Sequence, residues 1–171
     1  MQSLESRSAI VVLVVAIPCY ALAGDSGTVT PKAEAEEVMN AGIPFAQKML
    51  EAHGEFYPFA LARATSGKVV AVAAPAAEEH PTSQQVIDQL VASLKTGVAR
   101  GEYRATAIFA DARVLPPGKR ESTDAVRVSL EHIAGYCVDV FFPYSRGPDG
   151  KVTFGEIFAS NRSGAVFSNC K

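Results

Sequence analysis

Three side chains in the second half of the chain have the chemistry needed for proton transfer. Asp111 and Asp139 interrupt apolar stretches, and His132 follows the alternating apolar positions of its own segment. A carboxyl group withdrawn from water has a raised pKa and can act as a general base, and histidine changes charge near neutral pH. These residues are therefore the candidates for catalysis. The alternative is that both carboxylates face solvent and that His132 is a half-buried residue at a strand end.

The motifs of the common enzyme classes are absent from the sequence. It contains no G-x-S-x-G nucleophile elbow, no H-E-x-x-H zinc motif, no Walker loop, no C-x-x-C pair and no EF-hand loop. No serine or cysteine has a recognisable base partner, so a hydrolase with a covalent intermediate is not supported. We expect no cofactor and no metal site, and the sequence favours a protein without catalytic activity.

Residues 1–23 have the pattern of a secretory signal peptide. Ala9–Ile17 is a run of nine apolar residues, which as a helix spans about 14 Å, less than half of a bilayer core of ~30 Å. Pro18 ends the run, and Ala21-Leu22-Ala23 supplies the small residues that signal peptidase accepts. We predict cleavage after Ala23 and a periplasmic or secreted protein with no remaining membrane span. An uncleaved N-terminal anchor is the alternative.

Cleavage would leave residues 24–30 as a polar linker and residues 31–171 as a single domain. Two cysteines remain in that domain, Cys137 and Cys170. In an oxidising compartment an even pair favours one disulfide bond. This bond would close a loop of 33 residues and hold the C-terminal tail on the predicted sheet.

The composition is that of an ordinary globular protein. The 171 residues are 48% hydrophobic and 20% charged, which is enough apolar mass to form a core. The formal net charge is −2. Proteins that bind DNA or RNA usually carry a basic surplus that replaces counterions along the phosphates, so we expect no nucleic-acid partner.

Two helices are expected in the first hundred residues. Thr30-Pro31 is typical of a helix start, and the pattern continues to Gly54 with a kink or a division into two short helices at Gly42 and Pro44. A capping box at Thr82 begins the second helix, which ends at Gly101. Its apolar residues fall at helical spacing: Val86, Ile87, Leu90, Val91, Leu94 and Val98.

The other elements are strands. Two apolar runs on either side of Thr65-Ser66-Gly67 predict a β-hairpin between the helices. Four further strands are expected after the second helix, at residues 103–114, 123–133, 136–144 and 151–159. The order α-β-β-α-β-β-β-β indicates an α+β fold with an antiparallel sheet of five to six strands. In the second of these four strands, Val126, Val128 and Leu130 share one side, while Arg127, Ser129 and Glu131 share a side that is expected to face water.

Four segments, HGEFYPFALA, TDAVRVSLEH, VDVFFPY and VTFGEIFA, resemble a bacterial family of small α+β proteins of undefined role. The likeness covers roughly residues 33–160 and consists of hairpin and strand patterns, so it implies a fold and no catalytic residue. The element order is also similar to that of roadblock/profilin-like modules and of the nuclear-transport-factor-2-like cone fold.

The leading hypothesis is an exported, non-enzymatic binding module whose partner is another envelope or secreted protein. The alternative is a cone-type pocket protein that binds a small molecule and uses Asp111 or Asp139, supported by His132, for isomerase-like proton transfer. Convergence of these three residues in one cavity would distinguish the two hypotheses.

Overall fold

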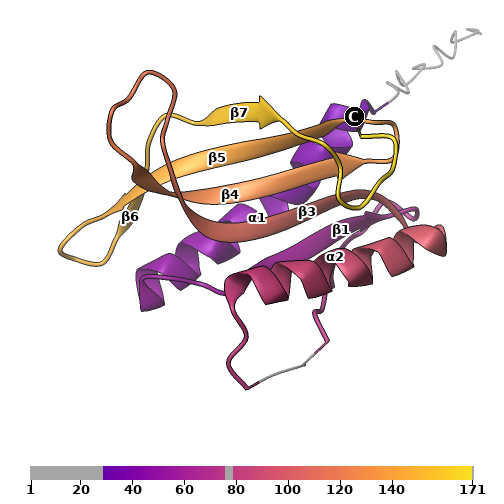
Figure 1. The fold of residues 1–171 in the computed structure, drawn as a ribbon, viewed down its shortest axis with the longest axis horizontal. Coiled ribbons are helices and arrows are strands. Elements are labelled where there is room, and N and C mark those ends of the chain that lie inside the picture. Colours follow the sequence, from indigo (N-terminus) through magenta and orange to yellow (C-terminus); the bar gives the residue numbers. More distant parts are fainter. Residues whose placement is uncertain (1–28, 76–78, 171) are drawn as a thin grey trace, which may run out of the picture.

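The computed structural model describes residues 29–75 and 79–170 (Figure 1). The predicted signal peptide, residues 1–23, and residues 24–28 of the predicted linker lie outside the described part of the chain. No helix among the described residues has the length and apolar character needed to cross a membrane.

One antiparallel sheet organises the described residues and confirms the α+β class (Figure 1). Its strand order is β2-β1-β3-β4-β5-β6, and β7 also pairs with β5. The sheet has seven strands, where five to six were expected. The strands are β1 (Phe59–Ala64), β2 (Val69–Val72), β3 (Tyr103–Val114), β4 (Thr123–His132), β5 (Cys137–Arg146), β6 (Val152–Phe154) and β7 (Phe158–Asn161).

The extra strand arises because the predicted strand 151–159 is interrupted. Both β6 and β7 pair with β5, but the register changes by one residue between Tyr144↔Phe154 and Phe141↔Phe158. Since successive side chains of a strand point to opposite faces, a one-residue shift exchanges the faces. Phe154 therefore packs against Phe142 on one side of the sheet, whereas Phe158 stacks on Phe141 on the other.

The first helix, α1, runs from Pro31 to His53 as one element with Pro44 inside it, so the expected alternative of two short helices was wrong. Its expected ends are confirmed, because Thr30 caps the start and Gly54 ends it at φ 81°. Pro44 is exposed, so water can reach the backbone carbonyl that lacks its usual partner. Gly42 is buried because the helix passes so close to the sheet that a Cβ there would overlap the ring of Phe109.

The second helix, α2 (Ser83–Ala99), begins with the predicted capping box between Thr82 and Gln85. It lies on the opposite face of the sheet from α1 (Figure 1). Its buried stripe of Val86, Leu90 and Leu94 covers the part of the sheet formed by β1, β2 and β3. The half of this face formed by β4 and β5 is not covered by α2.

A short segment of chain after β7 folds back over one end of that remaining half. Residues 165–170, here called the C-terminal segment, place Val166, Phe167 and Cys170 in the core cluster on the α2 side. As a result Ser129 and Glu131 are buried, with 8% and 1% of their surfaces exposed. The expectation that this face of β4 meets water was therefore wrong at the His132 end of the strand.

Candidate functional site

The sheet separates the three residues that the sequence suggested for catalysis. His132 faces α1, where its Nε2 lies 2.8 Å from an oxygen of Glu34. Asp111 lies on the same side of the sheet as His132 but toward the other end of the strands, where it contacts Tyr144. Asp139 points to the opposite side, toward Ser129 and Arg162. The structure therefore does not bring these three residues into one acid–base site.

His132 has both ring nitrogens in hydrogen bonds and is fully buried. Its Nδ1 accepts from the backbone amide of Ala134 at 3.0 Å. Nδ1 must therefore be the unprotonated nitrogen, and Nε2–H donates to Glu34. This arrangement connects the end of β4 to α1 and presents no free nitrogen for catalysis.

Glu34 is a buried carboxylate surrounded by cationic and polar partners. Arg63 and Arg104 lie 3.3 Å and 3.1 Å from its oxygens, and His132 donates to it. Burial raises the pKa of Glu34, but the hydrogen bonds from His132 and Arg104 and the charges of Arg63 and Arg104 outweigh burial, so the pKa lies below its usual value. The ionised carboxylate thus joins α1 to β1, β3 and β4.

Asp111 and Tyr144 form a pair between β3 and β5. The Tyr144 hydroxyl donates to Oδ1 of Asp111 at 3.0 Å. Burial raises the pKa of Asp111 and outweighs this hydrogen bond, and the charges of Asp124 and Glu55 act in the same direction as burial. Burial and the contact with Asp111 also raise the pKa of Tyr144. The raised pKa of Asp111 suits a general base, but no second acid or base from the candidate set accompanies it.

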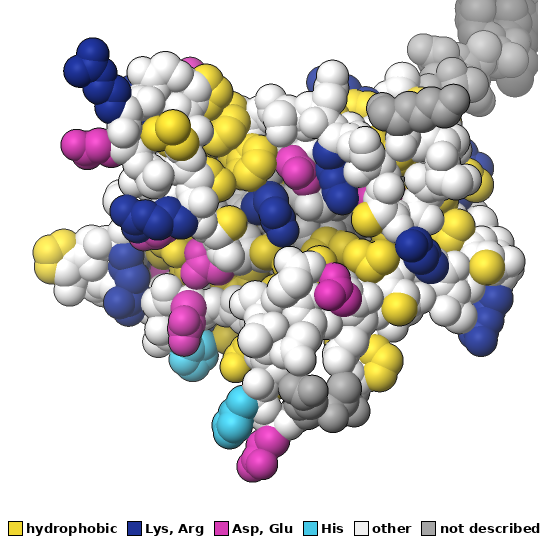
Figure 2. All heavy atoms as spheres, in the orientation of Figure 1, with side chains coloured by type: hydrophobic (Ala, Val, Ile, Leu, Met, Phe, Trp, Pro, Cys, Tyr) yellow, Lys and Arg dark blue, Asp and Glu magenta, His cyan; other side chains and the backbone are white. Residues whose placement is uncertain are grey.

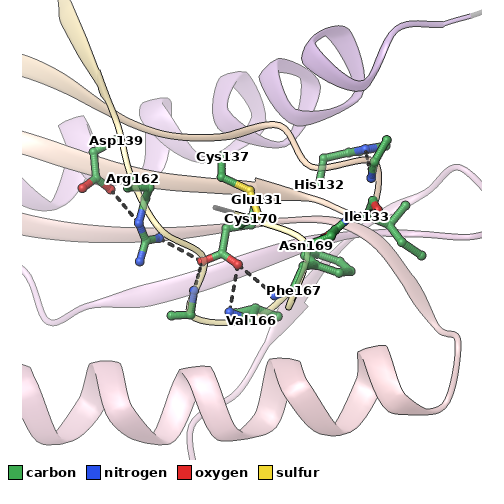
Figure 3. The surroundings of a disulfide bond; sticks show 12 residues. Glu131, His132, Ile133, Cys137, Asp139, Arg162, Val166, Phe167, Asn169 and Cys170 are labelled. Atoms are coloured by element: carbon green, nitrogen blue, oxygen red, sulfur yellow. Dashed lines mark hydrogen bonds and ion pairs between the residues drawn. A yellow bond between two sulfur atoms is a disulfide. The ribbon is translucent and has the colours of Figure 1, made fainter.

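The C-terminal segment is held by a carboxylate that the sequence analysis did not single out (Figure 3). Glu131 accepts hydrogen bonds from the backbone amides of Ala165, Val166 and Phe167 at 2.7, 2.8 and 2.9 Å. Arg162 completes the arrangement with an ion pair of 3.0 Å. Strict alternation along β4 places Glu131 on the face expected to meet water. Its partners become visible only in the structure, where the C-terminal segment folds back over this face.

The predicted disulfide between Cys137 and Cys170 is confirmed (Figure 3). Its Cα atoms are 5.7 Å apart, within the usual range for such bonds. Asn169 adds a hydrogen bond from its side-chain amide to the carbonyl of Ile133. The bond therefore fastens the C-terminal segment to β5, as the sequence predicted.

A hollow of about 320 Å³ lies between α2, the sheet and the C-terminal segment. Its size is near the lower end for small-molecule sites. Figure 2 shows hydrophobic, acidic and basic side chains gathered on this face of the molecule. The residues that line the hollow are Gln84, Ile87, Asp88, Val91, Ile108, Arg127, Ser129, Asp139, Arg162 and Ala165.

Arg127 has an unusual environment at the edge of this hollow. It is half-buried on β4, and its Nε is buried without a hydrogen-bond partner among the described residues. No described carboxylate forms an ion pair with it, whereas the neighbouring Arg162 is paired with both Glu131 and Asp139. Burying an unsatisfied polar group costs free energy, so Arg127 is the polar group in this hollow that most needs an external acceptor.

A second, larger hollow of about 720 Å³ opens on the same face of the sheet. It lies between the β3–β4 loop and the β6–β7 connection, with Pro116, Pro117, Pro143 and Phe158 among its apolar walls. The register places Arg127, Phe141 and Phe158 in one row across β4, β5 and β7, between the two hollows. The uncovered half of the sheet therefore offers an apolar surface with Arg127 near its centre.

The described residues contain no group of three or more His, Cys, Asp or Glu side chains placed to hold a metal ion. Comparisons with known proteins found no matching family model, no matching curated protein and no matching solved structure. The site must therefore be interpreted from its own geometry.

Proposed function

We propose that this chain is an exported binding module without catalytic activity, and that it binds a polypeptide segment of another envelope or secreted protein. The binding surface is the half of the sheet that α2 leaves uncovered, between α2 and the β6–β7 connection. The observation that carries this proposal is the half-buried Arg127, whose Nε lacks a partner among the described residues. We also propose that the chain is an exported member of the bacterial family of small α+β proteins that its sequence resembles.

Export is supported by two independent features of the chain. The short apolar run at Ala9–Ile17 has the length of a signal-peptide core. The disulfide between Cys137 and Cys170 is of a kind that persists in oxidising compartments. Both features are consistent with a periplasmic or secreted location.

The shape and chemistry of the surface favour an extended chain over a compact molecule. Two hollows follow each other on one face, with a row of Arg127, Phe141 and Phe158 between them. An extended peptide can place alternate side chains in successive pockets while its backbone meets polar groups. The isomerase-like alternative gains no support, because the sheet lies between Asp139 and the other two candidate residues, Asp111 and His132.

The test uses the exported, full-length mature chain, immobilised and exposed to two pools of random synthetic hexapeptides. One pool has free C-terminal carboxylates and the other has C-terminal amides, and mass spectrometry measures the peptides retained from either pool. Ile87→Lys places a charged side chain in the smaller hollow, and Ala92→Lys adds the same charge to the exposed side of α2.

We expect retention by the wild type and by Ala92→Lys, and a loss of retention by Ile87→Lys. Equal retention by all three proteins would place binding elsewhere and contradict the proposed surface. Retention of neither pool by the wild type would contradict the binding function itself. Thermal unfolding of each variant confirms that the folded protein is compared.

A further inference from the structure

The smaller hollow presents one free donor and one free acceptor. The donor is the guanidinium group of Arg127, which lines the hollow and forms no hydrogen bond or ion pair with a described residue, and whose Nε is buried. The acceptor belongs to Asp139, whose Oδ1 takes the hydrogen bond from Ser129 at 2.6 Å and the ion pair with Arg162 at 3.6 Å. No described residue donates a hydrogen bond to its other oxygen, Oδ2.

The register places these two groups close together on one face of the sheet. Ser129 lies opposite Asp139, and Arg127 lies opposite Phe141, so Arg127 and Asp139 are diagonal neighbours on β4 and β5. Diagonal neighbours are about 7–8 Å apart, within reach of long side chains. They nevertheless form no ion pair with each other. A small group with its own acceptor and donor can therefore satisfy both.

Charge in the hollow disfavours a simple anion and a simple cation. Asp88 and Asp139 both line the hollow and would repel an isolated anion that approached Arg127. Arg127 and Arg162 would repel an isolated cation in the same way. Ile87, Val91 and Ile108 supply an apolar wall beside these charges. The matching ligand carries a negative group, an adjacent hydrogen-bond donor and an apolar side chain.

We infer that this hollow binds an amino-acid-type terminus with an apolar side chain: its α-carboxylate accepts from Arg127, and the N–H on the adjacent carbon donates to Oδ2 of Asp139. This inference rests on the proposed function, and it identifies the C-terminal residue of the partner peptide as the group that is recognised. A free amino acid carries the same chemistry and is distinguished by experiment.

The first experiment compares the two hexapeptide pools described above. We expect the free-acid pool to be retained at least about tenfold better than the amide pool. This is the difference in affinity that the loss of one charge-assisted hydrogen bond produces. The retained acids should end in apolar residues. Equal retention of acids and amides would overturn this inference and leave the proposed function standing. Retention of neither pool would defeat both.

A second experiment tests the N–H contact with small ligands on the wild-type protein, by calorimetric titration. N-acetylleucine has both the carboxylate and the N–H, N-acetyl-N-methylleucine lacks the N–H, and N-acetylleucine amide lacks the carboxylate. We expect N-acetylleucine to bind more tightly than either analogue, and equal affinities would overturn the inference. Free leucine separates the two sources, because binding tighter than that of N-acetylleucine would identify the free amino acid as the ligand.

Variants connect this selectivity to the two side chains. Arg127→Gln removes the charge without breaking an ion pair or hydrogen bond of the described chain, so the fold should persist. We expect it to abolish the preference for acids over amides. Arg100→Gln, an exposed position at the end of α2, is the matched control and should keep the preference. Asp139→Asn should reduce the difference in affinity between N-acetylleucine and its N-methyl analogue. An unchanged preference for acids over amides in Arg127→Gln would refute the assignment of Arg127 as the carboxylate-binding residue.

Discussion

The carboxylate of Glu131 and the backbone amide of Phe167 lie 2.9 Å apart, although 36 residues separate them in the sequence. Ala165 and Val166 donate to the same carboxylate, so one buried side chain satisfies three backbone amides. The disulfide of the neighbouring strand holds the same segment at Cys170. A covalent bond and a charged hydrogen-bond acceptor therefore position the C-terminal segment together.

Replacing Glu131 by Gln should strongly destabilise the protein. The amide side chain loses the ion pair with Arg162 and places an N–H group where an acceptor is required. Breaking a buried pair of this kind costs about 3–5 kcal/mol of unfolding free energy, which urea denaturation would measure. Glu156→Gln, at an exposed position, should change stability by less than about 0.5 kcal/mol. Similar effects of both substitutions would refute this role of Glu131.

Removing the disulfide should release the C-terminal segment. For Cys137→Ala/Cys170→Ala we expect a loss of about 3–4 kcal/mol, from the chain-entropy treatment of a loop of this size. Hydrogen exchange at the amides of Ala165, Val166 and Phe167 should accelerate more than exchange in α1. If these amides remain as protected as in the oxidised protein, Glu131 alone suffices to hold the segment.

Stability should fall in acid because of Glu34. Its folded-state pKa lies below the ordinary value of 4.5, so the unfolded chain binds more protons as the pH falls. The stabilisation from ionised Glu34 is complete above the pKa of this group in the unfolded chain, and it is lost as the pH falls through its pKa in the folded protein. We expect Glu34→Gln to lower the unfolding free energy at neutral pH, with the difference from wild type narrowing below pH ~4.5. Glu36→Gln, which breaks the exposed pair with Lys32, should show no such pH dependence.

Gly42→Ala should destabilise the protein even though alanine favours helices. In an exposed helix the change would stabilise by about 1 kcal/mol, but here the new methyl group overlaps the ring of Phe109. Overpacking of this kind costs about 1–3 kcal/mol. The same substitution in a Phe109→Leu background should be less harmful, because the ring is gone. Calorimetric unfolding of the four proteins would measure the coupling, and additive effects would contradict the proposed overlap.

The parts of the fold that depend on neighbouring residues could be predicted from the sequence. The caps at Thr30 and Thr82 and the turn at Gly67 depend on side chains within a few positions, and each has the expected place. The Cys137–Cys170 bond could be predicted because only two cysteines lie beyond the predicted signal peptide, residues 1–23.

The features that depend on distant parts of the chain could not be predicted. Glu131 has the sequence context of a solvent-facing residue, and its burial results from a segment more than thirty residues later. The division into β6 and β7 depends on a register shift against β5 that alternation within one strand does not reveal. Arg127 becomes a candidate binding residue only because the nearby carboxylates of Glu131 and Asp139 pair with Arg162 and not with Arg127. One signal was available: a bond to Cys170 brings the tail over the sheet beside Glu131.

The position of the C-terminal segment also determines when folding can be completed. A nascent chain that has been synthesised only as far as β7 contains the helices and strands of the described residues, but Glu131 lacks its amide donors and Cys137 its partner. The fold is therefore complete only once residues 165–170 have been synthesised, so this short segment, and not the sheet, decides when the buried acceptor on β4 is satisfied.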